Sequence, residues 1–284
     1  MKPHSHSPYN NPLNHYICSQ KKRYMIKKLK YAIIADIGNF NPMHYDAEKE
    51  AELIAYCNKN GFTYLPSKSK KSVYKLENNH FVRRGIDDVV KVNPFDLIFD
   101  QRTIQKFEEP NHNEVRFIVE NNEIKGVVHI VDYNNAFISV ELYKALFQFE
   151  SNLRQLLIDN HLSNEDFISW VRDEATKTNN DYWHRKLETL EYRREQMSYA
   201  NLFQTFNFRD LLLFAKEKKL IELSNREIDN ISDIRNSVAH NKDVTSHSDE
   251  NGMIVYDFEG LDIFLEQMNS FFQSYELLAD KVNE

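Results

Sequence analysis

The chain has 284 residues, 41% hydrophobic and 28% charged, which is typical of a globular protein long enough for two domains. No apolar run reaches the ~20 residues that a membrane helix needs, and the N-terminus lacks the apolar core of a secretory signal. Two cysteines, Cys18 and Cys57, are too few for a disulfide framework or a cysteine metal site. We therefore expect a cytoplasmic protein that does not bind membranes.

The charge is unevenly distributed. Residues 1–30 carry seven basic and no acidic residues, whereas the rest of the chain has 29 basic and 43 acidic residues. A basic tail on an acidic body can contact nucleic acid, but a solvated tail is the simpler interpretation. The polar composition before Met25 is typical of disorder, and Met25 itself would serve as a natural start. We predict a basic, disordered tail at 1–29, an N-terminal domain at 30–137 and a helical domain at 138–284.

The N-terminal domain begins with an apolar run at residues 31–37, which predicts a short strand. Asp46 and Gly61 are placed to begin and end a helix. The apolar face of this helix would consist of Ala47, Ala51, Ile54 and Ala55. Two strands are predicted next, at residues 62–66 and 72–77.

A second cycle begins at Asp88, with a short strand and then a helix around residues 94–107. Residues 114–120 and 123–131 predict two strands joined at Asn121-Asn122, a favourable two-residue hairpin turn. The domain therefore has the pattern of two copies of helix, strand, strand, each preceded by a short strand.

From Ser139 the pattern is helical. Two pairs, Ser163 with Asp166 and Ser224 with Glu227, predict capping boxes at helix starts. The helix that follows Ser224 would bury Ile228, Ile231, Ile234 and Val238, and it would end at Asn241. A last long helix would bury Leu261, Leu265, Met268, Phe272, Tyr275 and Leu278. The charged helix at 181–196 predicts a solvated face, although its Arg185, Lys186, Arg193 and Arg194 could bind an RNA backbone.

The stretch Arg235-Asn236-Ser237-Val238-Ala239-His240 combines a permanent cation, an amide and an imidazole. Together, these groups can hold a phosphate and move a proton. Five residues along a helix rotate the direction by about 140°, so Arg235 and His240 do not converge within one chain. Alternatively, His240 could cap the helix and Arg235 could pair with Asp229 or Asp233.

Residues 139–284 resemble the HEPN superfamily, whose signature is Arg, a polar residue that is often Asn, and His late in the third core helix. Arg235, Asn236 and His240 match it. The resemblance implies a helical bundle, with residues 163–204 as an insertion. It also implies a homodimeric endoribonuclease that requires no metal or cofactor and leaves a 2′,3′-cyclic phosphate. Glu150 and Arg154, one turn apart on the first long helix, would support the site, or they form an ordinary surface pair.

The stretch EVRFIVENNEIKGVVHIVDYN resembles a cystathionine-β-synthase-type (CBS) module. Gly126 and Asp132 match the family pattern, in which the Asp binds a ribose, and His129 replaces its Thr or Ser. The first copy keeps Leu65-Pro66 but lacks the Gly and the Asp. The resemblance implies a tandem of βαββα modules and an adenine-nucleotide ligand.

The sequence therefore predicts an α+β protein, with a CBS-like tandem followed by a HEPN-like helical bundle. The predicted function is a metal-independent endoribonuclease acting on RNA as a homodimer and controlled through the tandem by a nucleotide or an antitoxin-like partner. By family analogy it would be a phage-defence or toxin effector. The alternative is a non-catalytic nucleotide-sensing scaffold with a helical dimerisation domain.

Overall fold

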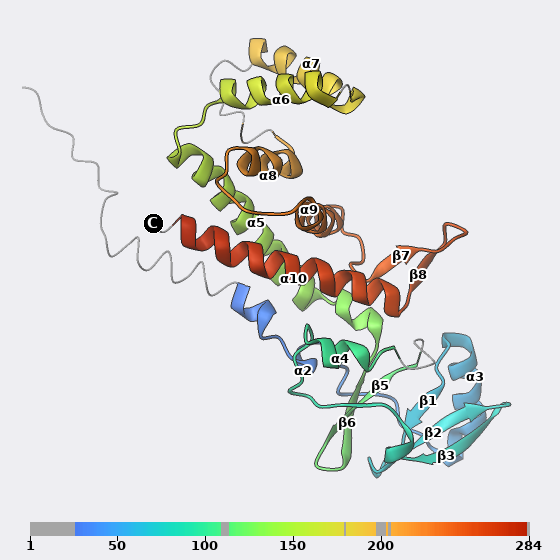
Figure 1. Cartoon of the computed structure of the whole chain (residues 1–284). Helices are drawn as coiled ribbons and strands as arrows, with labels where there is room; N and C mark the ends of the chain where they lie inside the picture. Colours follow the sequence, from blue (N-terminus) through green and yellow to red (C-terminus); the bar gives the residue numbers. More distant parts are fainter. Residues whose placement is uncertain (1–25, 109–113, 179, 197–202, 204–205, 283–284) are drawn as a thin grey trace, which may run out of the picture. The chain divides into compact units, whose positions relative to one another are not determined.

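The protein combines helices with small sheets and has a helical C-terminal region (Figure 1). The computed structural model describes residues 26–108, 114–178, 180–196, 203 and 206–282.

The chain divides into two compact units. Unit 1 comprises residues 1–24, 144–233 and 270–284, and unit 2 comprises residues 25–143 and 234–269. Three long helices contribute residues to both units: α5 (Ala136–Asp159), α9 (Asn225–Ala239) and α10 (Phe258–Lys281).

The predicted tail is shorter than expected. Residues 1–25 lie outside the described residues, but residues 26–30 are helical. Ile26 and Leu29 on this helix are buried. The prediction of disorder as far as residue 29 is therefore wrong, because residues 26–29 lie in a helix with two buried apolar side chains one turn apart.

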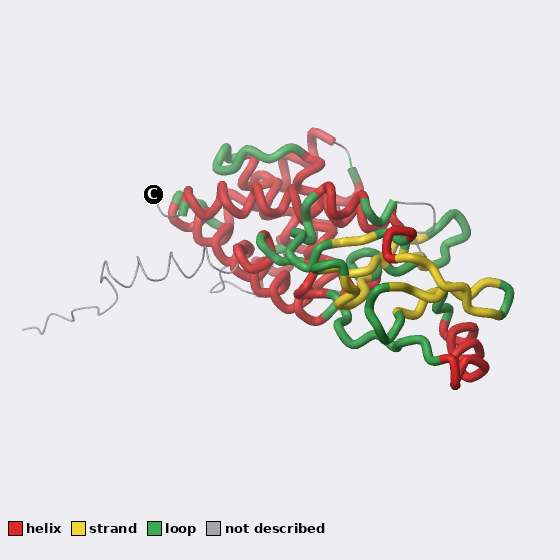
Figure 2. The backbone as a smooth tube through the Cα atoms, turned by 90° about the horizontal axis from the view of Figure 1, so that it is seen from below, coloured by secondary structure: helices red, strands yellow, loops and turns green. Residues whose placement is uncertain are grey.

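All strands of the described residues belong to unit 2 (Figure 2). Three antiparallel strands form the first sheet: β1 (Tyr64–Pro66), β2 (Ser72–Glu77) and β3 (His80–Gly85). The second sheet has β4 (Lys91–Val92) parallel to β5 (Arg116–Glu120), which is antiparallel to β6 (Glu123–Val128). A hairpin consists of β7 (Ser246–Ser248) and β8 (Ile254–Tyr256).

The predicted strand at residues 31–37 is wrong, because this run contains a helical turn, α2 (Ile34–Ile37). The Asp36 carboxylate accepts a hydrogen bond of 2.9 Å from the Ile33 N–H, a local bond that favours a helix start. Ile34 and Ile37 are buried, so the run contributes to the core as expected of an apolar segment. Periodicity alone does not separate a short buried strand from a short buried helix.

The predicted end of α3 (Glu50–Asn60) at Gly61 is confirmed, whereas Asp46 caps the short 3₁₀ turn Ala47–Lys49 that leads into the helix. The Asp46 side chain accepts a hydrogen bond from Glu48 N at 3.2 Å at the start of a short 3₁₀ turn, and Gly61 ends the helix with φ of +70°. The predicted apolar face is wrong, however. Leu53 and Cys57 are buried, whereas Ala47, Ala51 and Ala55 are exposed and Ile54 is half-buried. Leu53 and Cys57 pack with Leu65 of β1 because they offer more apolar surface than the alanines.

The hairpin turn at Asn121-Asn122 is confirmed, since both residues have positive φ, at 52° and 57°. The same turn recurs at Asn78-Asn79, with φ of 49° and 61°, where it joins β2 to the unpredicted strand β3. Asparagine tolerates this left-handed conformation better than most residues.

The second cycle has the predicted order of strand, helix, strand, strand, with α4 (Gln101–Gln105) between β4 and β5. Val73 of β2 packs against Phe117 of β5 and Ile124 of β6, so the two small sheets share a core cluster. The finer assignment to CBS modules remains a prediction.

Arg116 at the start of β5 is only 2% exposed. Its guanidinium donates to three backbone carbonyls: Lys106 O at 2.6 Å, Phe107 O at 3.1 Å and Glu114 O at 2.8 Å. These bonds satisfy donors of a buried cation, and they hold together the two chain segments that flank residues 108–113.

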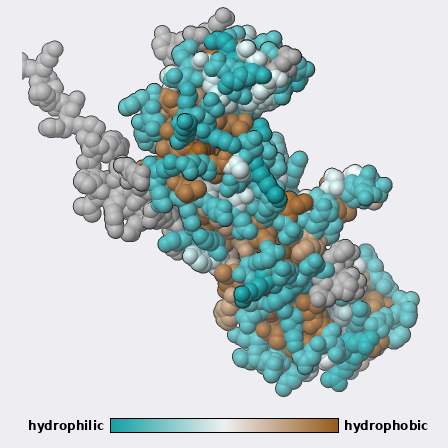
Figure 3. All heavy atoms as spheres, viewed as in Figure 1, coloured by the Kyte–Doolittle hydropathy of each residue, from teal (hydrophilic) through white to brown (hydrophobic). Residues whose placement is uncertain are grey.

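Unit 1 contains three further helices: α6 (Asn164–Thr178), α7 (Asp181–Gln196) and α8 (Phe208–Glu217). Hydrophilic residues cover most of α6 and α7 on the face shown in Figure 3, as predicted for the charged helix. Beneath them, Phe167 stacks on Phe206 with ring centroids 3.7 Å apart, and Trp170 packs against Trp183 and Phe214. Such aromatic pairs stabilise a core beyond their area alone.

Both capping boxes are confirmed. Ser163 N and Ser224 N donate to the side chains of Asp166 and Glu227, and each serine hydroxyl accepts a hydrogen bond in return from the backbone N–H of its acidic partner. The buried stripe of α10 is confirmed at all six positions, and that of α9 at its three isoleucines, with Val238 half-buried. None of the helices in the described part of the chain is both long and apolar enough to cross a bilayer.

Candidate functional site

The candidate site begins with the way α9 ends. The helix stops at Ala239, and Asn241 adopts a left-handed conformation with φ of 50°. Lys242 N donates to Ser237 O at 2.8 Å, and Asn241 N donates to Val238 O at 3.2 Å. This pair of bonds is a Schellman motif, which satisfies the last carbonyls of the helix with backbone groups. His240 is therefore the residue at the helix end, but its ring is not used for capping.

The three motif residues lie away from the buried stripe of α9. Ile234 is fully buried, whereas Arg235 is half-buried and Asn236 and His240 are exposed. Arg235 Nη1 lies 3.5 Å from Asn236 Oδ1, a contact at the limit of a hydrogen bond. The packing of the isoleucine stripe thus leaves the amide and the imidazole exposed at the end of α9, with the half-buried cation next to the amide.

This arrangement can supply the chemistry of RNA cleavage, but not from one chain alone. The guanidinium of Arg235 offers a planar fork to phosphate oxygens. An exposed imidazole can take or give a proton near neutral pH. The five-residue separation still turns Arg235 and His240 about 140° apart along α9. A cleft that uses both groups would therefore need a second copy of the chain.

Asp229, a sequence-predicted alternative partner for Arg235, forms an ion pair with Arg209, with Arg209 Nη2 2.7 Å from Asp229 Oδ1. Both of these residues belong to unit 1.

Glu150 and Arg154, predicted as supporting residues, form an ion pair on α5, with Arg154 Nη2 2.5 Å from Glu150 Oε1. Arg154 Nε also donates to Phe203 O at 2.6 Å. The pair therefore binds the segment after α7 to the first long helix. It belongs to unit 1, whereas Arg235, Asn236 and His240 belong to unit 2.

Gly126, predicted to bind a nucleotide, has a packing reason to be glycine. A Cβ at this position would lie 2.5 Å from Asn39 O. Val127, the residue after Gly126, exchanges two backbone hydrogen bonds of 2.8 and 3.0 Å with Asn39. Only glycine permits this approach of the two segments without a shift of the backbone.

His129 precedes a short 3₁₀ turn (Ile130–Asn134) that contains Asp132, and local hydrogen bonds hold the start of this turn. His129 N donates to Asp132 Oδ2 at 2.7 Å, and Val131 N donates to His129 Nδ1 at 3.3 Å. Burial raises the pKa of the Asp132 carboxyl, against the opposing effect of the hydrogen bond from His129 N. These contacts give Asp132 a structural role whether or not a ribose binds.

Sequence reasoning missed one group that could hold a metal ion: His247, Asp257 and Glu259. These residues come from the β7–β8 hairpin and the first turn of α10, a region predicted only as a polar excursion. A His followed ten residues later by Asp-x-Glu is too common a pattern to signal a site by itself.

Comparison with known proteins adds no family. No family model, no curated protein and no solved structure matches the chain. The resemblances to HEPN and CBS proteins rest on the motifs in the sequence.

Proposed function

We propose that the protein is a metal-independent endoribonuclease of HEPN type that acts as a homodimer. The observation that carries this proposal is the outward placement of Arg235, Asn236 and His240 at the Schellman end of α9. In a dimer, Arg235 would stabilise the charge that develops on the phosphorane, and His240 would transfer the proton of the attacking 2′-hydroxyl or the leaving oxygen. Asn236 would orient the phosphate.

The activity test uses the full chain with RNA in EDTA. His240→Ala and Arg235→Ala are each expected to reduce cleavage at least about 10²-fold, the range for a lost acid–base group or oxyanion donor. His80→Ala and Arg102→Ala are matched controls, since both replace exposed residues of the same unit. Cleavage by His240→Ala at the parent rate, with the controls unchanged, would refute the proposal.

A mixing experiment tests the composite cleft. Neither Arg235→Ala nor His240→Ala dimers would contain both group types, but a mixed dimer would contain one Arg235 and one His240. After subunit exchange, the mixture is therefore expected to cleave faster than either variant alone. If the mixture cleaves RNA no faster than either variant alone, each chain needs its own Arg235 and His240. That result would contradict a cleft composed of residues from both chains.

The N-terminal domain would provide control through an adenine nucleotide. Because Asp132 already accepts a hydrogen bond from His129 N, a ribose must either share this carboxylate or displace that bond. Calorimetry with AMP and ATP, comparing the parent with Asp132→Asn, tests this part of the proposal. Failure of both nucleotides to bind the parent would remove nucleotide control, and it would leave the cleavage assay as the separate test of the ribonuclease.

A further inference from the structure

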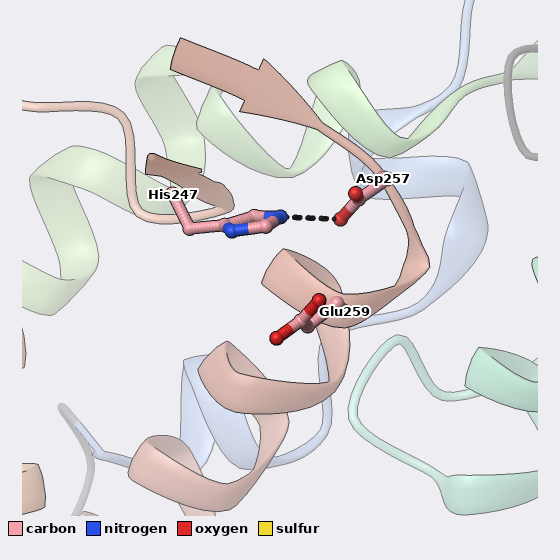
Figure 4. A group of neighbouring side chains, drawn as sticks. All are labelled: His247, Asp257 and Glu259. Carbon is pink, nitrogen blue, oxygen red and sulfur yellow. Dashed lines mark hydrogen bonds and ion pairs between the residues drawn. The ribbon is translucent and has the colours of Figure 1, made fainter. Parts of the chain in front are cut away.

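Three side chains of unit 2 that can ligate metals converge beside the start of α10 (Figure 4). His247 lies on β7, Asp257 directly precedes α10, and Glu259 lies in its first turn. One ligand atom from each of the three lies within 4.8 Å of the others. His247 Nε2 is already 2.8 Å from Asp257 Oδ1.

Gly260 allows this convergence. A Cβ on Gly260 would lie 2.2 Å from Thr245 O and 3.2 Å from His247 Cδ2, so any larger residue would push β7 away from α10. The glycine thus lets the imidazole lie against the first helical turn, where two carboxylates are near.

The backbone that carries His247 is held from a distant part of the sequence. Thr245, two residues earlier, is fully buried. Asn134 Nδ2 donates to Thr245 Oγ1 at 2.7 Å, and Thr245 N donates to Asn134 Oδ1 at 3.2 Å. Asp257 is held as well, since its Oδ1 accepts a hydrogen bond of 3.0 Å from Gly260 N. Two of the three ligands are therefore preorganised, as metal sites require.

The composition of the group indicates which ion it suits. Imidazole nitrogen favours zinc and its neighbours over magnesium or calcium, and carboxylate oxygens complete such sites at ~2.0–2.2 Å from the ion. Two carboxylates and a neutral imidazole carry two negative charges, which match a divalent cation. Helix capping explains Asp257 alone, and it does not require a His and a second carboxylate beside it.

We propose that His247, Asp257 and Glu259 bind one divalent transition-metal ion of the zinc class, which clamps the β7–β8 hairpin to the first turn of α10. Three protein ligands leave a position for water, so the site is not a closed structural cage. The exposed Glu259 side chain completes the site by a small rotamer change. This site is independent of the proposed ribonuclease chemistry, which uses no metal.

The test is calorimetric titration of ZnCl₂ into EDTA-stripped full-length protein. His4, His6 and His15 near the N-terminus could also bind zinc, so all variants carry alanine at these three positions. In this background we expect one zinc ion per chain and a Tm that rises when zinc is added, because the ion binds the folded state.

Glu259→Gln is the decisive variant, because it replaces an exposed side chain by one of the same shape. Its Kd for zinc is expected to rise at least about tenfold, with an unchanged Tm in EDTA. Asp257→Asn, which keeps a capping oxygen, and His247→Gln should weaken binding at least as much, whereas His80→Ala should not.

Absence of zinc binding by the background protein would overturn the proposal. So would unchanged zinc binding by both Glu259→Gln and His247→Gln, which would show an adventitious ion only. Equal affinity for MgCl₂ and ZnCl₂ would overturn the assignment to the zinc class.

Discussion

Lys186→Ala is expected to destabilise unit 1 far more than the loss of an ordinary helix lysine. Lys186 Nζ on α7 lies 2.7 Å from Asp210 Oδ2 on α8, and the Asp210 side chain is fully buried. This contact is an ion pair rather than an aligned hydrogen bond. Tyr182 OH donates to the other carboxylate oxygen, Oδ1, at 2.6 Å, and burial together with this carboxylate raises the pKa of Tyr182.

The magnitude follows from what the substitution leaves behind. At 2.7 Å and an effective dielectric constant of about 20, the pair attracts by about 6 kcal/mol before desolvation is counted. Without Lys186, the hydroxyl of Tyr182 is the one hydrogen-bond partner that the described residues leave to the buried carboxylate. Removal of one partner of a buried pair typically costs about 3–5 kcal/mol, and we expect a loss in this range. The sequence-based alternative in which Lys186 binds RNA is disfavoured, because its side chain is only 13% exposed.

Urea denaturation followed by tryptophan fluorescence measures the effect. The two tryptophans of the chain, Trp170 and Trp183, pack against each other on α6 and α7, so the signal reports this region. Lys177→Ala is the matched control, because Lys177 pairs with Glu174 at the surface of α6. This variant should lose much less free energy of unfolding than Lys186→Ala. A Lys186→Ala loss below about 1 kcal/mol, the range of a surface pair, would refute the reasoning.

Three further predictions concern stability and are tested by urea denaturation. Burial raises the pKa of Asp132, so the folded state binds the proton of this carboxyl more tightly than the unfolded state does. The free energy of unfolding is therefore expected to fall as the pH rises from about 4, the pKa of an unfolded Asp, to the raised pKa of the folded protein. Asp132→Asn, which keeps the acceptor for His129 N, should remove that pH dependence, whereas Asp132→Ala should destabilise; the opposite order would contradict the capping role. Gly126→Ala should cost about 1–3 kcal/mol, because its Cβ would meet Asn39 O at 2.5 Å, and a neutral result would show that the backbone relaxes freely. Ser224→Ala should cost about 1 kcal/mol through the lost cap of α9, and no change would mean that backbone packing alone starts the helix.

Structural features that depend only on a few neighbouring residues could be predicted from the sequence. The capping boxes at Ser163 and Ser224, the turn at Asn121-Asn122 and the end of α9 at Asn241 depend on bonds within five residues. The buried stripe of α10 was predictable for the same reason, because a long helix repeats its apolar period several times.

Features decided by distant contacts could not be predicted. The helical turn at Ile34–Ile37 is supported by hydrogen bonds from Ile34 N to Asp96 O and from Ala35 N to Pro94 O, both 2.9 Å. The strand β3 is a mostly exposed strand, so it lacks the alternation of apolar residues that identifies strands.

The candidate sites divide in the same way. Arg235 and His240 could be recognised because they lie within six consecutive residues of the sequence. The group of His247, Asp257 and Glu259 was not, because it depends on the close approach of Thr245 to Gly260 and on hydrogen bonds of Thr245 to a residue 111 positions earlier.

The buried Arg116 has a consequence for the engineering of this protein. Its bonds to Lys106 O, Phe107 O and Glu114 O join the chain segments on the two sides of residues 108–113. Loop-closure entropy grows slowly, by about 0.6 kcal/mol for each doubling of length, so an inserted peptide here would add little to the free energy of folding. A fluorescent reporter or an affinity epitope could therefore be inserted at this position while the sheet of β4, β5 and β6 keeps its register.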